Sequence, residues 1–210
     1  MANIAYVRVS SVMQNESRQL EALEKHNIDK WFTEKVSGKN TDRPQLKAML
    51  DYVREGDIVF IMVSGDGGMD IGMGSALGTA IRGHRLLLFE YDNGGYMNTG
   101  YQLSYSTPMG AKSATSHVGQ KQYGKDFFPK DMPQIMAAAG IPYVATVAES
   151  HPTDFIKKAA KAAAYAKDYG MAYVRALSAC PLNWNDNPAD EAKVIEAAVA
   201  SCYFPLYEVE

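Results

Sequence analysis

Residues 58–68 of this chain read IVFIMVSGDGG, and this stretch decides the fold. Its first six residues are apolar without a break, which is typical of a strand buried on both faces in the centre of a parallel sheet. The glycines and the aspartate that follow predict a tight turn, and small residues after it predict a helix from about Asp70 to Arg82. A buried strand that turns directly into a helix is the repeating unit of α/β proteins.

The alternation of strands and helices continues on both sides of this unit. We expect further strands at residues 4–9, 31–32, 86–91, 143–147 and 172–177, and helices at residues 17–26, 44–54, 132–139, 153–169 and 189–201. Repeated β-α units imply an α/β fold with a doubly wound, mostly parallel sheet and helices on both faces. We therefore expect one composite domain, in which residues 1–63 and 64–210 share a continuous sheet. Residues 98–130 form a long irregular stretch, of a length that is uncommon unless it serves a site.

The charge pattern argues against a nucleic-acid partner. Residues 1–63 contain nine basic and nine acidic side chains, and the whole chain of 210 residues has a net charge of -3. Neither part has the concentrated basic surface that holds a DNA backbone. No apolar run has the length of a membrane span and no secretory signal is visible, so we expect a cytoplasmic protein that does not contact membranes.

The sequence contains two cysteines, Cys180 and Cys202. Two thiols cannot build a disulfide framework, and they cannot complete a four-ligand zinc or iron–sulfur site. We interpret them as structural or surface thiols in a reducing compartment.

Polar residues follow two of the buried strands and predict a site for a diphosphate and a metal ion. Asp66 stands between two glycines after the first strand, and Asn93 follows the second, with Gly95 two residues later. The carboxyl ends of parallel strands meet at one edge of a sheet, where ligands of α/β proteins bind. Glycines let the backbone approach a phosphate, and the helix N-terminus supplies N–H donors. Carboxylate, amide and carbonyl oxygens suit Mg²⁺. A Gly-Asp-Gly triplet alone is more often an ordinary turn, so the second polar segment carries this prediction.

Several segments resemble the β subunit of the 2-oxoacid:ferredoxin oxidoreductases, which bind thiamine diphosphate. They are GDGGMDIG (65–72), YDN (91–93), YMNTG (96–100), STPMGA (106–111), GIPYVAT (140–146), CP (180–181) and FPLYE (204–208). The resemblance covers residues 64–210. It implies that thiamine diphosphate and Mg²⁺ bind here, with Asp66, Asn93 and the Gly95 carbonyl as metal ligands. It also implies a cofactor-binding set of Gly65, Asp66, Gly67, Asn93, Asn98 and Thr99.

The chain departs from this family in ways that predict incomplete catalysis. In the family, a cysteine-bearing segment supplies most ligands of a [4Fe–4S] cluster, and here only Cys180 matches a ligand, which argues against a cluster. Gly94 and Gly95 stand where we expect glutamate and alanine, and His117 stands where proline is more common. An α subunit supplies the carboxylate that activates the cofactor. The resemblance therefore implies an oxidoreductase α subunit, another protein or a second copy of the chain as partner.

Residues 1–63 instead resemble the start of a serine recombinase (resolvase/invertase) catalytic domain. The segments are YVRVSS (6–11), KVSG (35–38), TDRP (41–44) and EGD (55–57). The resemblance implies that Ser10 attacks a DNA phosphodiester while Arg8 and Arg43 hold the phosphate. Without the resemblance, Ser10 is an ordinary turn or cap residue, and Arg8 is a solvated or paired side chain. The further arginines of the recombinases do not follow Ser64.

The two resemblances predict a hybrid, either a natural fusion or an engineered or generated chimera. The favoured function is binding of thiamine diphosphate and Mg²⁺ by an incomplete oxidoreductase β subunit. The second is a recombinase-like action on DNA, which the charge balance disfavours. The third is a protein-binding scaffold with neither activity.

Overall fold

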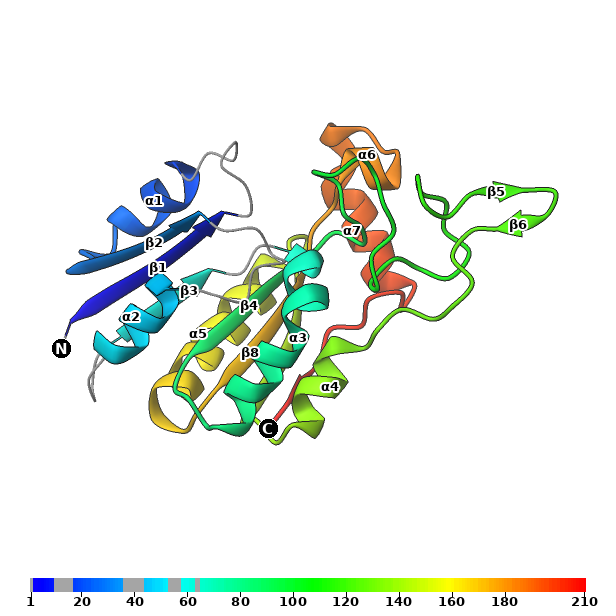
Figure 1. Ribbon diagram of the computed structural model, residues 1–210. Coiled ribbons are helices and arrows are strands. Elements are labelled where there is room, and N and C mark those ends of the chain that lie inside the picture. Colours follow the sequence, from blue (N-terminus) through cyan, green and yellow to red (C-terminus); the bar gives the residue numbers. More distant parts are fainter. Residues whose placement is uncertain (1, 10–16, 36–43, 53–57, 63–64) are drawn as a thin grey trace.

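A computed structural model of the chain describes residues 2–9, 17–35, 44–52, 58–62 and 65–210. Within these ranges the core is a seven-stranded sheet with the order β2-β1-β3-β4-β8-β7-β9 (Figure 1). Its strands are β1 (Asn3–Val9), β2 (Lys30–Lys35), β3 (Ile58–Met62), β4 (Leu87–Asp92), β7 (Tyr143–Ala148), β8 (Ala172–Leu177) and β9 (Glu208–Val209). The strands pair in parallel, except that β9 runs antiparallel to β7.

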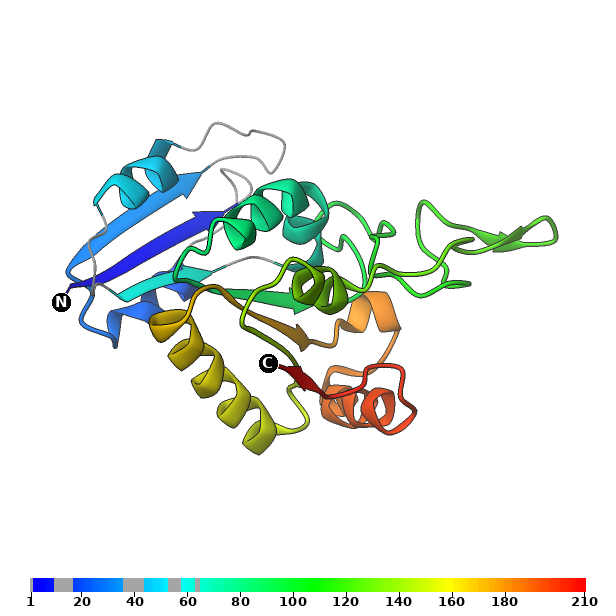
Figure 2. The same ribbon diagram turned by 90° about the horizontal axis from the view of Figure 1, so that it is seen from below.

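Helices cover both faces of the sheet. They are α1 (Ser17–Glu24), α2 (Pro44–Tyr52), α3 (Gly65–Ile81), α4 (Met132–Ala138), α5 (Pro152–Asp168), α6 (Pro181–Trp184) and α7 (Glu191–Ala200), and a 3₁₀ turn spans Pro188–Asp190. Figure 2 shows α2 and α3 on one face and α1 and α5 on the other. Methionines of α3 and α4 pack on Leu88 and Tyr173, and alanines of α5 pack on Val147 and Val174 of the opposite face. This two-sided burial explains the unbroken apolar strands.

The predicted α/β fold class is confirmed. Strand β3, which belongs to the first 63 residues, pairs with β4, so one sheet contains strands from both parts of the chain. Several local details differ from the sequence predictions, among them the short helix α6, which lies where a loop is expected. Helix α3 begins at Gly65 rather than near Asp70, so the Gly-Asp-Gly triplet forms the first helical turn. Strand β9 was not predicted, because two residues are too short for a periodic pattern. A small hairpin, β5 (Val118–Gly119) and β6 (Gln122–Tyr123), interrupts the irregular stretch.

Residues 93–131 connect β4 to α4 and will be called the 93–131 loop. Part of this loop folds back over the carboxyl ends of the strands, and the β5–β6 hairpin projects away from the sheet (Figures 1 and 2). Among the described residues, no helix has the length and apolar character needed to cross a membrane.

Candidate site at the carboxyl edge of β3 and β4

Asp66 lies in the first turn of α3, at the edge where the sequence predicts a metal ligand. Its residue is 3% exposed, and its Oδ2 atom has no hydrogen-bond partner among the described residues. Burial, and then the nearby carboxylate of Asp92, raise the pKa of Asp66 to about 7, although the Ser104 hydroxyl acts in the opposite direction. A buried carboxylate with a free oxygen is suited to bind a cation, because a cation would compensate for the lost hydration.

The turn that follows β4 is held by hydrogen bonds from its own side chains and from the 93–131 loop. Asp92 Oδ1 accepts a hydrogen bond from the Gly94 amide at 2.8 Å, and Asn93 Oδ1 accepts one from the Gly95 amide at 3.2 Å. The hydroxyl of Thr107 donates to the Gly94 carbonyl at 2.6 Å. The turn is therefore fixed before any ligand arrives.

Helix α6 holds the same turn from the other side. Asn183 Nδ2 and Trp184 Nε1 donate to the Asn93 carbonyl at 2.6 Å and 2.9 Å. A Cβ atom at Gly95 would overlap the Met97 side chain and would lie 3.3 Å from Asn183 Nδ2. Only glycine fits at this position without a shift of its neighbours.

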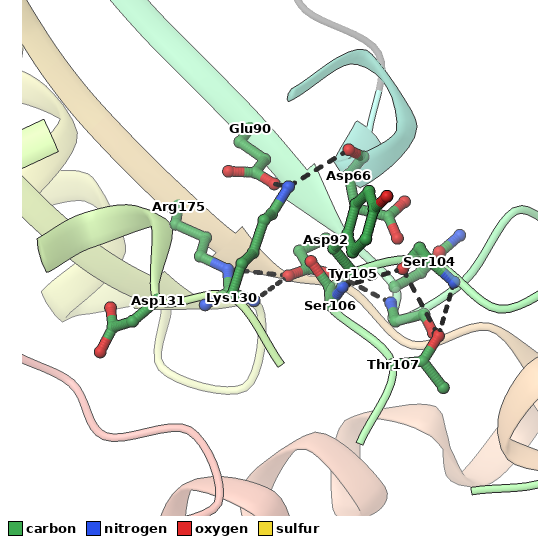
Figure 3. Close-up of polar contacts among 12 residues, drawn as sticks. Asp66, Glu90, Asp92, Ser104, Tyr105, Ser106, Thr107, Lys130, Asp131 and Arg175 are labelled. Carbon is green, nitrogen blue, oxygen red and sulfur yellow. Dashed lines mark hydrogen bonds and ion pairs between the residues drawn. The ribbon is translucent and has the colours of Figure 1, made fainter. Parts of the chain in front are cut away.

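Two more buried carboxylates, those of Glu90 and Asp92 in β4, have basic partners (Figure 3). Arg175 of β8 pairs with Asp92, and Lys130 lies 3.4 Å from Oε1 of Glu90. The hydroxyl of Tyr173 donates to Glu90 Oε2. Glu90 is 0% exposed, and its burial raises its pKa to about 7, an effect that Lys130 only partly offsets.

The structure brings the predicted glycines next to the β4 turn. Gly65 has a φ of +67°, and a Cβ atom there would lie 3.3 Å from the Tyr91 carbonyl oxygen. A Cβ atom at Gly67 would lie 3.1 Å from the Tyr96 ring, so the missing side chain makes room for that ring. Both glycines permit the close approach of α3 to the residues that follow β4.

The other predicted residues lie farther out or outside the described residues. Asn98 and Thr99 are exposed, and the Thr99 hydroxyl donates within its own turn, to Gln102 Oε1 at 2.9 Å. Ser10 and Arg43 fall outside the described residues, and for Arg8 only the backbone, in β1, is described. Their grouping into a recombinase site stays a prediction.

The residue types predicted as ligands are ones whose oxygen atoms suit a magnesium ion. Within the described part of the chain, no group of three or more His, Cys, Asp or Glu residues is placed to hold a metal. A site at Asp66 would therefore combine one carboxylate with the amide oxygen of Asn93 and the carbonyl of Gly95, which are the oxygen ligands that Mg²⁺ accepts. The unpaired Oδ2 atom supports this fit. Cys180 precedes α6 and Cys202 is exposed, and both are free thiols.

Sequence reasoning missed several residues that build this site. They are Asp70, Thr107, Lys130, Arg175, Asn183 and Trp184. Two of them carry a usable signal: Asp70 lies four residues after Asp66 and thus on the same helix face, and Arg175 is a charge within an apolar strand. Thr107 lies in the STPMGA segment, and Lys130, Asn183 and Trp184 come from distant segments without a local pattern.

Two protein-family models match parts of this chain. The model of "Thiamine pyrophosphate enzyme, C-terminal TPP binding domain" matches residues 48–176, and "Resolvase, N terminal domain" matches residues 3–64. A 2-oxoglutarate:ferredoxin oxidoreductase from Magnetococcus marinus has a similar fold, with a TM-score of 0.61 and 21% identity over 86% of this chain and 55% of that chain.

Curated relatives are pyruvate synthase subunits PorB. The protein of Methanothermobacter thermautotrophicus is 42% identical over 73% of this chain and 53% of its own length, and that of Methanocaldococcus jannaschii is 44% identical over 71% and 50%. The chain thus spans about half the length of these relatives. The match to the Thermotoga maritima subunit is 38% identical and covers 88% of this chain and 56% of that subunit, more than residues 64–210 alone can supply. The hybrid boundary near Ser64 therefore stays a prediction. Since the thiamine pyrophosphate model matches more than half of the chain, the chain belongs to the thiamine pyrophosphate enzyme family.

Proposed function

We propose that this chain is the cofactor-binding part of a 2-oxoacid:ferredoxin oxidoreductase β subunit. In this proposal it binds thiamine diphosphate and Mg²⁺ between the first turn of α3 and the turn after β4. Without a partner subunit it does not turn over substrate. Similarity to the PorB subunits supports the proposal at the level of the family.

The observation that carries the proposal is the buried Asp66 carboxylate, which has an oxygen unpartnered among the described residues. Oδ2 of Asp66 has no partner among the described residues, and the Asn93–Gly95 turn is fixed by hydrogen bonds from three segments of the chain. A cation held by Asp66 would neutralise the buried carboxylate and would supply positive charge for an anionic cofactor. The N-terminus of α3 adds backbone N–H donors for the same anion.

This chain's part in the chemistry is to bind and orient the cofactor. Bound thiamine diphosphate supplies a carbanion at its thiazolium ring, which is the chemistry that such enzymes use on 2-oxoacids. Asp66, Asn93 and the Gly95 carbonyl would hold the metal, and the fixed turn would keep these oxygens in place. The group that activates the cofactor would come from a second subunit, and the reaction therefore requires that partner.

The proposal is tested by calorimetric titration of thiamine diphosphate with Mg²⁺ into the protein. We expect saturable, magnesium-dependent binding, and we expect Asp66→Asn to weaken it by at least about tenfold, because the variant keeps the shape but removes the charge. Asp126→Asn changes an exposed carboxylate of the 93–131 loop and serves as the control, with unchanged affinity. A folded wild-type protein that shows no binding would disprove the proposal.

A recombinase-like function is the second candidate, because the resolvase model matches residues 3–64. It requires Ser10 to cleave a DNA phosphodiester with help from Arg8 and Arg43. Incubation with supercoiled plasmid tests it, with Ser10→Ala as the control. Nicking that is lost in the variant would support this candidate, and intact plasmid would eliminate it.

A further inference from the structure

Asp70 is the point on α3 where distant parts of the 93–131 loop converge. It lies one helical turn after Asp66, and its side chain is 1% exposed. Its Oδ2 atom accepts hydrogen bonds from the Tyr96 hydroxyl at 2.6 Å and from the Tyr105 amide at 3.0 Å. Its Oδ1 atom pairs with the ammonium group of Lys130. One carboxylate therefore binds the beginning, the middle and the end of the loop.

Lys130 completes this arrangement from the end of the loop. Its ammonium group also lies 3.4 Å from Glu90 Oε1 and 3.4 Å from the Asp66 carbonyl oxygen (Figure 3). Its backbone amide donates to the Tyr105 carbonyl at 2.8 Å. With a side chain that is 7% exposed, Lys130 joins the loop to α3 and to β4 at once.

The contacts of Asp70 also hold the Tyr96 ring beside the first turn of α3. The ring lies against Gly67 in the first turn of α3, and its hydroxyl reaches the carboxylate one turn later. Tyr96 directly follows Gly95, whose carbonyl is a candidate metal ligand. Movement of the loop away from Asp70 would therefore remove one of the contacts that join the β4 turn to α3.

A second buried lysine of the same loop has a different role. The ammonium group of Lys125 donates to the carbonyls of Ser104, Tyr105 and Thr107 at 3.2 Å, 2.9 Å and 2.6 Å. All three acceptors belong to the loop itself. Lys125 thus supports the internal shape of the loop, whereas Lys130 attaches the loop to α3, and the two lysines form a matched pair for comparison.

We propose that Asp70 and Lys130 form a latch that holds the 93–131 loop against the first turn of α3, and that both are positioning residues of the cofactor site. The latch itself is a property of the protein without ligand. Its effect on the cofactor rests on the proposed function. Breaking the latch releases Tyr96, Tyr105 and the end of the loop, while the sheet and its covering helices stay folded, because their apolar core side chains are unchanged.

Hydrogen exchange of the protein without cofactor tests the latch. In Lys130→Met and in Asp70→Asn we expect the amides of Tyr105 and Lys130 to exchange at least about tenfold faster, because both of these donors depend on the closed loop. Peptides from α5 and β8 keep their wild-type exchange. Lys130→Arg restores slow exchange, since a guanidinium group can pair with the same carboxylate. In Lys125→Met we expect amides inside the loop to lose protection from exchange. The Tyr105 amide, which donates to Asp70, keeps more protection in this variant than in Lys130→Met.

The outcomes separate the latch from the proposed function. Wild-type exchange of the Tyr105 amide in Lys130→Met would overturn the latch, whatever the protein binds. If Lys130→Met does not fold, Tyr96→Phe takes its place, because it removes a single donor to Asp70 and keeps the ring on Gly67. In calorimetry we expect the latch variants to bind thiamine diphosphate with Mg²⁺ at least about tenfold more weakly and Lys130→Arg to recover affinity. Faster exchange with unchanged affinity would overturn the positioning role, and a wild-type protein without affinity would refute the proposed function alone.

Discussion

Arg175 on β8 and Asp92 at the end of β4 form a buried ion pair across two parallel strands. Nε of Arg175 lies 2.7 Å from Oδ2 of Asp92, and their side chains are 13% and 3% exposed. In the strand register Arg175 is opposite Glu90, so its side chain reaches diagonally toward the carboxyl edge. The other oxygen of Asp92 holds the Gly94 amide. The pair thereby connects the middle of the sheet to the turn of the candidate site.

Removing the guanidinium group should destabilise the protein strongly. We expect Arg175→Met to lower the free energy of unfolding by about 3–5 kcal/mol, because Asp92 would stay buried without its partner. Chemical denaturation measured by circular dichroism gives this value. Lys193→Met serves as the control, because its pair with Asp190 is exposed and should contribute less than about 1 kcal/mol. Equal losses in the free energy of unfolding of the two variants would show that the buried pair contributes no more to stability than the exposed pair.

The stability of the fold should fall as the pH rises from about 5 toward 8. Glu90 has a pKa of about 7 in the folded protein against 4.5 as its ordinary value, so in this range the folded state binds a proton that the unfolded state releases. A proton bound only by the folded state stabilises it, and this contribution, on the order of 1–3 kcal/mol, is lost as the pH passes the folded pKa. Glu90→Gln stays neutral at every pH, and we expect it to reduce the dependence of unfolding on pH between 5 and 8, while the part due to Asp66, whose pKa is also raised to about 7, remains. An unchanged slope in this variant would assign the effect to other groups.

Two glycines of the 93–131 loop should respond differently to alanine. Gly124 has a φ of +80°, and a Cβ atom there would overlap the Gly110 carbonyl and lie 2.7 Å from the Ala111 carbonyl oxygen. At Gly119 a Cβ atom would have no neighbour within 4 Å. We expect Gly124→Ala to speed chymotryptic cleavage within the loop about tenfold, from strain of roughly 1–3 kcal/mol, and Gly119→Ala to leave it unchanged. Similar cleavage of both variants would contradict the packing at the base of the hairpin.

The hydrogen bond from the indole N–H of Trp184 to the Asn93 carbonyl should strengthen binding of the cofactor. Trp184→Phe keeps an aromatic ring but removes this donor, and we expect affinity for thiamine diphosphate with Mg²⁺ to fall about fivefold, which corresponds to one hydrogen bond of about 1 kcal/mol. Leu182→Ala in the same helix is the control, because Leu182 is 63% exposed. Calorimetric titration of the wild type and the two variants measures these affinities. Identical affinities would mean that the hydrogen bond from Asn183 is enough to hold the Asn93 carbonyl.

The elements with strong apolar runs could be predicted from the sequence because burial on both faces leaves a clear pattern. Strand β8 begins and ends at the expected residues, and β7 and α4 differ from expectation by a single residue at one end. The start of α3 was predicted too late, since a glycine-rich segment has low helix propensity. Here the close packing of Gly67 against Tyr96 favours the helical turn despite that propensity.

Only some residues of the candidate site could be predicted from the sequence. Asp66 and Asn93 stand at the ends of apolar strands, and such positions can be located from the pattern alone. Lys130 and Trp184 contribute through contacts between segments far apart in the chain, and nothing in their neighbours distinguishes them from surface residues. Lys125 is the extreme case, since a lysine in a polar loop is expected in solvent, yet three carbonyls enclose its ammonium group.

The junction between β3 and β4 has a consequence for how this fold can be assembled from parts. Among the described residues the two strands are paired at Phe60–Leu87, Ile61–Leu88 and Met62–Phe89. The hydrogen bonds of such a ladder join backbone groups, while the side chains that pack on each face also determine the stability of the pair. A different β-α unit in place of β3 would therefore need an apolar strand of similar length whose side chains pack on both faces of the sheet. Evolutionary exchange or protein engineering at this junction would alter the outer half of the sheet and leave the groups around Asp92 in place.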